Sequence, residues 1–238
     1  RGRVGCRIRY LNSAGIHPRE ATALTALSAA LPDNWLLYAS FQYLPPRDRP
    51  LDIDALIVMD DRVLLLEIKD WNGVLTCNGD MWLVDDRPRG RSPVYSVAHK
   101  ARVLGKVIRD AIPGFQFYVD SAVLMTGTAG PATLPPGEAD RIFTVAQLPT
   151  IVDPVRRSSL LESQPLRPRK AHSYGPEFDR LTKTSRRFKP KEVDWDGYRV
   201  VQENLFVHPK AVWSEHRSVL KQDSRHSAIL SFGLQYWL

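Results

Sequence analysis

Two neighbouring apolar runs, separated by three polar residues, dominate the hydrophobic pattern of the chain. The first covers Leu51–Met59 and the second covers Val63–Lys69. Runs of this length with a short polar turn between them are typical of largely buried strands joined as a hairpin. Asp54 lies inside the first run, and Glu67 and Lys69 lie inside the second. Since a buried charge is costly unless it has a partner, the pattern predicts a specific role for these three residues.

The alternation of side chains along a strand predicts how these charges meet. Glu67 and Lys69 are two residues apart and therefore share a face, which Asp54 can reach from the adjoining strand. Two carboxylates and an amine on one sheet face suit a divalent cation that activates water against a phosphodiester. The alternative interpretation is a buried Glu–Lys pair with an Asp at the strand end. We favour the first because buried ion pairs are weak stabilisers.

The remaining pattern predicts alternating helices and strands. Residues 18–31 have a helix signature, with Pro18 at the first helical position and apolar residues at helical spacing. Residues 94–112 carry a second apolar stripe of helical period. Further strands are expected at residues 35–43, 74–77, 81–84, 117–125 and 141–145, with polar loops at 85–92 and 127–139.

The second predicted helix also carries a basic stripe, formed by His99, Arg102, Lys106 and Arg109, with Lys100 beside it. Such a stripe suits contacts with the phosphates of a nucleic acid. A solvated helix face is the alternative, and the sequence leaves both open.

Composition and charge divide the chain into three parts. Residues 1–154 carry 17 basic and 17 acidic residues and are neutral overall, whereas residues 155–191 carry 11 basic and 3 acidic residues. We expect one domain over 1–154 and a basic, proline-containing linker over 155–191, which could also contact phosphate. Residues 192–238 are expected to be a C-terminal extension or the start of a further module. Within these last two parts, the pattern predicts a short helix at 176–187, the start of a strand at 194–201 and weak helical periodicity at 209–230.

Other features point to a soluble cytoplasmic protein. The chain is 43% hydrophobic and 25% charged, within the ordinary range for globular proteins. It has no apolar run long enough to cross a membrane, and Arg1–Tyr10 lacks the apolar core of a signal peptide. Cys6 and Cys77 are far apart and form no metal-binding spacing, so we expect reduced thiols.

The ordered set of Glu20 in a helix, Asp54 in a strand, and Glu67 and Lys69 in the next strand resembles the PD-(D/E)xK nuclease superfamily. Within it, the chain resembles the NERD (nuclease-related) domain family. The residues that carry the resemblance are Glu20, 31–35, 52–58, 66–73 and 92–94. The resemblance covers roughly residues 5–130. It implies an α/β, restriction-endonuclease-like αβββαβ core, with a mixed central sheet flanked by helices.

The resemblance also implies a Mg²⁺-dependent nuclease acting on DNA, with Mn²⁺ as a substitute. Asp54, Glu67 and the carbonyl of Ile68 would hold the metal, Lys69 would position the attacking water, and Glu20 would help orient the metal. Asp52 is a reserve ligand. Ser96 stands where family members commonly carry Gln. The side chain of His99 or Lys100 could take the place of that Gln. A role in DNA processing or defence against foreign DNA rests on family association alone. The alternative is a non-catalytic nucleic-acid-binding or regulatory module of a kinase- or helicase-linked protein.

Overall fold

The computed structural model describes residues 5–10, 18–43, 51–130, 134–160, 171–184, 198–207, 213–220, 222 and 225–233. The chain divides into two compact units, Arg1–Arg186 and Arg187–Leu238. Among the described residues, no helix combines the length and the apolar character required to cross a membrane.

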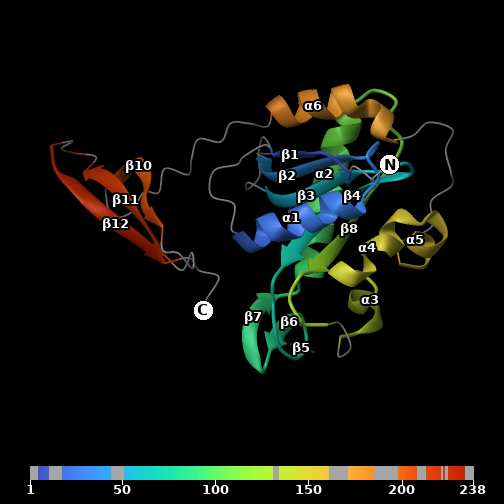
Figure 1. Cartoon of the computed structure of the whole chain (residues 1–238), viewed down its shortest axis with the longest axis horizontal. Coiled ribbons are helices and arrows are strands. Elements are labelled where there is room, and N and C mark those ends of the chain that lie inside the picture. Colours follow the sequence, from blue (N-terminus) through green and yellow to red (C-terminus); the bar gives the residue numbers. More distant parts are fainter. Residues whose placement is uncertain are drawn as a thin grey trace. The chain divides into compact units, whose positions relative to one another are not determined.

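A six-stranded mixed sheet forms the centre of the first unit (Figure 1). Its strands, in spatial order, are β1 (Ile8–Tyr10), β2 (Leu36–Tyr43), β3 (Leu51–Val58), β4 (Arg62–Lys69), β8 (Tyr118–Met125) and β9 (Ile142–Thr144). Strands β2, β3 and β4 are antiparallel neighbours, whereas β1 is parallel to β2, and β4, β8 and β9 are parallel. The two central apolar runs of the sequence are therefore the β3–β4 hairpin.

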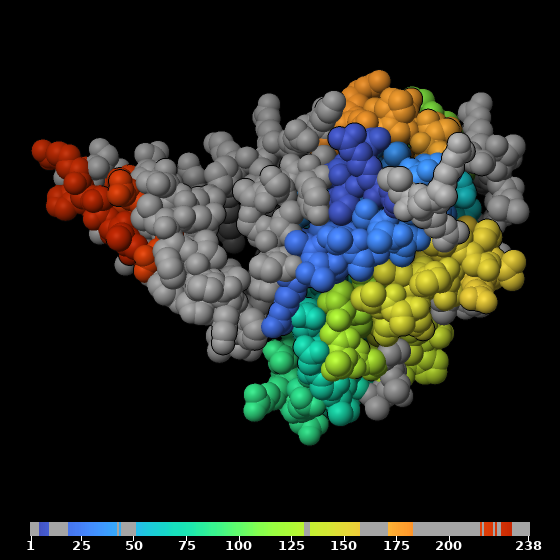
Figure 2. Space-filling model, viewed as in Figure 1, coloured from blue at the N-terminus to red at the C-terminus, as the bar shows by residue number. Residues whose placement is uncertain are grey.

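The sheet packs an apolar core on each face. One core contains Leu24 and Leu27 of α1 (Pro18–Ala30) and Ile151 of α4 (Leu148–Val152). In Figure 2, α1 (blue) and the segment with α4 and α5 (Pro154–Leu160; yellow) lie side by side. The other core contains Val97, Leu104 and Ile108 of α2 (Pro93–Ala111). The apolar stripes predicted for both helices therefore face the sheet.

A small three-stranded sheet precedes α2. It consists of β5 (Leu75–Asn78), β6 (Met81–Val84) and β7 (Arg87–Arg91). The strands predicted at 74–77 and 81–84 pair through a hairpin turn that contains Gly79, which has φ 60°, a conformation that glycine adopts without steric cost. Trp82 of β6 is fully buried and joins the α2 core.

The first unit continues past residue 154, where the sequence placed the end of the domain. It includes α5 and the pair η3 (Ala171–Tyr174) and α6 (Gly175–Thr184). Phe178 of α6 is fully buried in the α2 core, and the Tyr38 hydroxyl donates a hydrogen bond to Asp179 at 2.7 Å. The described parts of the basic segment thus pack on the sheet. Its residues 161–170 and 185–191 lie outside the described residues.

The second unit contains a three-stranded antiparallel sheet. Its strands are β10 (Tyr198–Val207), β11 (Trp213–Leu220) and β12 (Ser227–Gly233). The expectation of helical periodicity at 209–230 is wrong, because this region supplies β11 and most of β12. The two strands pair continuously from Trp213 to Val219, which satisfies backbone groups that a helix would bond internally. The predicted strand start at 194–201 agrees with β10 only from Tyr198, since residues 194–197 lie outside the described residues.

The predicted fold class, a mixed sheet flanked by helices in a restriction-endonuclease-like arrangement, is confirmed. Two loop assignments are wrong. Residues 85–92 contain β7, whose polar sequence hides an edge strand that is held by backbone pairing with β6. Residues 127–139 contain the short helix α3 (Pro136–Ala139), which begins at a proline in the first helical turn.

Candidate active site

The site lies where β3 and β4 separate. Pairing between the two strands runs from Val58 opposite Val63 to Ala55 opposite Leu66, and ends there. Beyond that point β3 continues to pair with β2, and β4 with β8. Asp54 and Glu67 are the next residues on the two strands, so both stand at this fork. The Ile68 amide donates to a carboxylate oxygen of Asp54 at 2.7 Å, so a side chain holds the fork together where the hairpin pairing stops.

An irregularity in β2 brings Glu20 to the fork. Ser40 lies opposite Asp54 in the β2–β3 register and has φ 55°, which is uncommon for a residue other than glycine. Its hydroxyl donates to Glu20 Oε1 at 3.3 Å. On the neighbouring strand, Ile53 and Ala55 pack in different cores although they are two residues apart. The regular alternation of side chains between the two faces of the sheet is therefore broken at Asp54. The carboxylate of Glu20 comes to this point from α1, which packs on the face opposite to α2.

Two lysines contact Glu67. Lys69 Nζ lies 2.9 Å from Glu67 Oε1, and Lys100 Nζ lies 2.6 Å from Glu67 Oε2. The side chains of Glu67, Lys69 and Lys100 are only 13%, 23% and 15% exposed. From the sequence, Lys100 is a candidate both for nucleic-acid contacts and as a replacement for the usual Gln at Ser96; the structure places it against Glu67. We call Glu20, Asp54, Glu67, Lys69 and Lys100 the fork cluster.

The carboxylates of the fork cluster differ in proton affinity. Burial, together with the charge of Glu67, raises the pKa of Asp54 to about 7. Burial also raises the pKa of Glu20, to which the charge of Glu67 adds. For Glu67, burial acts in the same direction, but the charges and hydrogen bonds of Lys69 and Lys100 outweigh it and lower the pKa. The site therefore keeps Glu67 ionised, whereas the positive charge near Asp54 does not offset its burial.

An ion pair at the rim holds the first turn of α1 near the end of β4. Arg19 lies 2.7 Å from Asp70, whose carboxylate also accepts a hydrogen bond from Thr126 at 3.2 Å. Arg19 precedes Glu20 and Asp70 follows Lys69, so this contact fixes the helix turn that carries Glu20. Ser40 and Arg19 were not predicted from the sequence, where their only signal was position in a strand or adjacency to Glu20. Asp70 lies in the range 66–73 that carries the family resemblance, but it was given no role of its own.

The donor atoms suit a hard divalent cation, although the described residues contain no group of three or more His, Cys, Asp or Glu side chains that could hold a metal. Mg²⁺ commonly uses one or two carboxylates and completes its shell with water and phosphate oxygens. Asp54 and Glu67 supply two carboxylates, and a bound cation would offset the burial and repulsion that raise the pKa of Asp54. The residues thus fit Mg²⁺, with the Ile68 carbonyl as the expected third ligand.

The other candidate residues lie outside the fork cluster. Asp52, the reserve ligand, is exposed on β3, and Ser96 is exposed on the first turns of α2. The basic stripe of His99, Arg102, Lys106 and Arg109 is exposed along α2, and Tyr95, 60% exposed, extends it toward the helix start. We call these five residues the α2 stripe. The helix therefore directs Lys100 into the site and keeps the α2 stripe on the surface.

Comparison with known proteins agrees with this geometry. Residues 17–126 match the model of the nuclease-related domain family, a range that includes α1, the β3–β4 hairpin, α2 and β8. A probable kinase, PglW, of Streptomyces coelicolor is 28% identical over 137 residues, which are 54% of this chain and 9% of that protein. No solved structure matches the chain. The match to the nuclease-related domain family therefore covers residues 17–126, the part of the chain that contains the whole fork cluster.

Proposed function

We propose that the first unit is a metal-dependent nuclease that hydrolyses DNA phosphodiester bonds. The observation that carries the proposal is the meeting of Asp54 and Glu67 at the fork with Lys69 in contact with Glu67. Such a site combines ligands for a hard cation with a fixed ammonium group. The family match supports a nuclease-related function, and the described geometry supplies the residues for the chemistry.

Each residue of the fork cluster has a distinct role in this proposal. Asp54, Glu67 and the Ile68 carbonyl would hold Mg²⁺ or Mn²⁺, which when bound supplies Lewis acidity toward the phosphate and lowers the pKa of water. The Lys69 ammonium orients the attacking water and stabilises negative charge on the scissile phosphate. Glu20, tied to Ser40 and close enough to raise the pKa of Asp54, adds negative charge that favours the cation.

The α2 stripe supports DNA as the partner. Four of its members are basic, all five are exposed, and they follow one face of the helix that also supplies Lys100. Phosphate contacts supply most sequence-independent affinity for DNA. The exposed Tyr95 ring adds a surface on which an unpaired base can stack.

Cleavage assays test the proposal directly. Plasmid DNA and a single-stranded oligonucleotide are incubated with the protein in Mg²⁺, Mn²⁺ or EDTA. We expect metal-dependent cleavage that falls by about 10³-fold in Lys69→Met and Glu67→Gln. Arg156→Met removes a positive charge from a side chain that is 70% exposed on α5, and serves as the matched control with unchanged cleavage. Cleavage that persists in Lys69→Met or in EDTA would contradict the proposed mechanism.

A second candidate function is a non-catalytic nucleic-acid-binding or regulatory module in a kinase- or helicase-linked protein. The similarity to a probable kinase, of which the matched region is only 9%, favours this candidate. The α2 stripe would then bind nucleic acid without hydrolysis. Salt-sensitive DNA binding, combined with no cleavage in Mg²⁺ or Mn²⁺, would support this candidate over the nuclease.

A further inference from the structure

Both carboxylate oxygens of Glu67 are engaged by ammonium groups. Lys69 Nζ contacts Oε1 and Lys100 Nζ contacts Oε2, at 2.9 and 2.6 Å. Each ammonium group occupies one lone-pair position of its oxygen and repels a divalent cation, which in the case of Mg²⁺ needs direct contact at about 2.0–2.1 Å. Glu67 therefore becomes a stronger metal ligand when one of the lysines leaves it.

The two lysines are not equally able to leave. Lys69 is on the same strand as Glu67, two residues away on the same face, and its backbone carbonyl accepts a hydrogen bond from Thr126. Its side chain is therefore anchored on the strand that carries Glu67. Lys100 has the same flexible four-carbon side chain but is anchored on α2, a different element from the strand that carries Glu67. It lies on the helix that carries the exposed basic residues at 99, 102 and 106.

The charge of the fork cluster points to the same lysine. Three carboxylates, those of Glu20, Asp54 and Glu67, face two ammonium groups, so Lys100 offsets much of the charge that would attract a cation. A phosphodiester offers Lys100 another anion close to its exposed neighbours on α2. Movement of Lys100 from Glu67 to a phosphate would free Oε2 and also make the site more negative.

We propose that Lys100 is an exchangeable counter-ion that couples the binding of a divalent cation to the binding of a phosphodiester. The inference rests on the proposed metal site at Asp54 and Glu67. Without substrate, Lys100 occupies Glu67 and weakens cation binding. With substrate, Lys100 pairs with a phosphate and Glu67 accepts the cation. By linkage, each ligand tightens the binding of the other by the same factor.

Calorimetric titration of the full chain with Mg²⁺ tests the coupling, in the absence and presence of a short single-stranded oligonucleotide with phosphorothioate linkages to slow cleavage. For the unmodified protein, we expect the oligonucleotide to tighten Mg²⁺ binding by about 10-fold, a typical coupling between two sites. Lys100→Gln keeps a hydrogen-bond donor without the charge. It should bind Mg²⁺ alone about 10-fold more tightly than the unmodified protein, with a coupling factor close to one.

Two matched variants separate this role from a general loss of charge or of folding. Lys100→Arg retains the positive charge and should retain coupling. Lys106→Gln removes a charge from the exposed face of the same helix; it should weaken oligonucleotide binding and leave the affinity for Mg²⁺ alone unchanged. Circular dichroism checks that each variant keeps its secondary structure.

The proposal is overturned if Lys100→Gln binds Mg²⁺ alone no more tightly than the unmodified protein, or if its coupling factor is unchanged. Those results leave the nuclease proposal standing when cleavage still depends on Lys69 and on metal. Failure of the nuclease proposal has a different signature, since Mg²⁺ binding would then be the same in Glu67→Gln as in the unmodified protein.

Discussion

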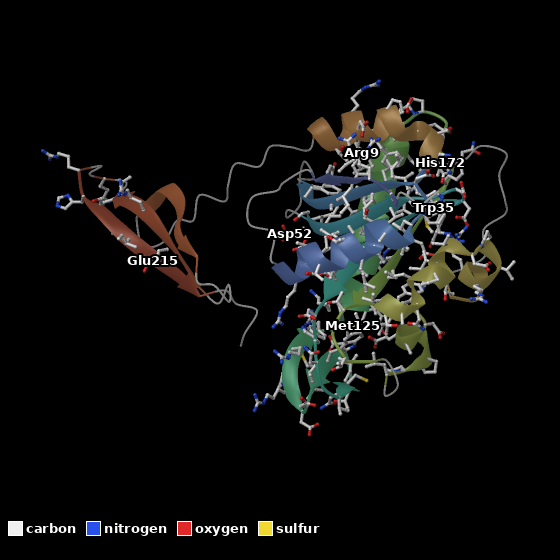
Figure 3. All side chains as sticks on the ribbon, in the orientation of Figure 1. Arg9, Trp35, Asp52, Met125, His172 and Glu215 are labelled. Carbon is white, nitrogen blue, oxygen red and sulfur yellow. The ribbon has the colours of Figure 1, made fainter. Side chains whose placement is uncertain are left out.

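The two ends of β4 carry two charged clusters that are built in opposite ways. The strand ends at Lys69, within the fork cluster. It begins at Arg62, which is 2% exposed and contacts Asp61 at 3.0 Å and Asp120 at 3.1 Å. Arg157, also 2% exposed, contacts Asp61 at 3.1 Å, and Arg141 pairs with Asp120. We call these five residues the basal network. Figure 3 labels Met125, which pairs with Lys69 at the fork end, and Trp35, whose ring lies 5.5 Å from the Arg157 guanidinium carbon.

The basal network and the fork cluster differ in how their charges are compensated. Each carboxylate of the basal network contacts two guanidinium groups, and Arg157 also donates to the Ile151 carbonyl at 2.7 Å. At the fork, Asp54 and Glu67 lie close together, and the pKa of Asp54 is raised to about 7 by burial and by Glu67. Buried charges that are fully paired matter to the fold because the removal of one partner leaves the other without compensation in the interior. Incompletely compensated charge in a partly buried site is typical of a binding or catalytic function.

The largest effect on stability is expected at the basal network. Arg62→Met leaves Asp61 with one guanidinium partner and Asp120 with one, while both stay nearly buried. Breaking a buried pair by removing one partner costs about 3–5 kcal/mol. We expect the free energy of unfolding of the first unit to fall by this amount in urea denaturation.

The matched control for Arg62→Met is Arg91→Met. Arg91 forms an ion pair with Asp80 at 3.4 Å, but the two side chains are 85% and 64% exposed. Exposed pairs contribute about 0–1 kcal/mol, so this variant should unfold almost like the unmodified protein. Equal effects of the two substitutions would show that the basal network does not stabilise the fold through its buried charges.

At the fork, in contrast, we expect a substitution that raises the free energy of unfolding. The pKa of Asp54 in the folded protein, about 7, exceeds its ordinary value of 3.8. Between these values the folded state binds more protons than the unfolded state, so stability falls as the pH rises from about 4 to 7. An asparagine side chain has no charge to bury, and its carbonyl can still accept the Ile68 amide. We therefore expect Asp54→Asn to raise the free energy of unfolding at pH 8 in EDTA, by at most about 4 kcal/mol.

The pH dependence identifies the cause of that gain. The difference between Asp54→Asn and the unmodified protein should shrink toward zero as the pH is lowered from about 8 to 4, because Asp54 then becomes protonated. A difference that stays constant over this range, or a destabilised variant at pH 8, would exclude ionisation of Asp54 as the source of the destabilisation.

The sequence was sufficient for those parts of the fold whose pattern is local. The stripes of α1 and α2 and the apolar runs of β3 and β4 each mark the element they form, which is why these elements were predicted. Strand β7 was missed because it has no apolar pattern and depends on pairing with β6. In the same way, β11 and β12 depend on pairing across strands, which a helical period in a short window cannot reveal.

The site shows the same limit. The order of Glu20, Asp54, Glu67 and Lys69 along the chain was sufficient to nominate them, and the structure brings them together at the fork. The sequence could not show that Lys100 turns toward Glu67 while its neighbours on α2 face outward. Nor could it show the end of β3–β4 pairing at Ala55 and Leu66, which depends on how β2 and β8 hold the two strands apart.

We expect the smallest effects from substitutions in the α2 stripe. Its charges are exposed, whereas those of the basal network and the fork cluster are largely buried. Arg102→Gln and Lys106→Gln should each weaken DNA binding about threefold, and each should reduce the dependence of affinity on salt by about one phosphate contact. Arg156→Gln on α5 should change neither quantity. The measurement is fluorescence anisotropy of a labelled duplex at several salt concentrations. If the Arg102 and Lys106 variants match Arg156→Gln, the α2 stripe is a solvated helix face and DNA reaches the fork by another surface. If they differ in the expected way, the chain separates three uses of charge: basal pairs stabilise the fold, fork carboxylates favour a cation, and the exposed stripe contacts phosphate.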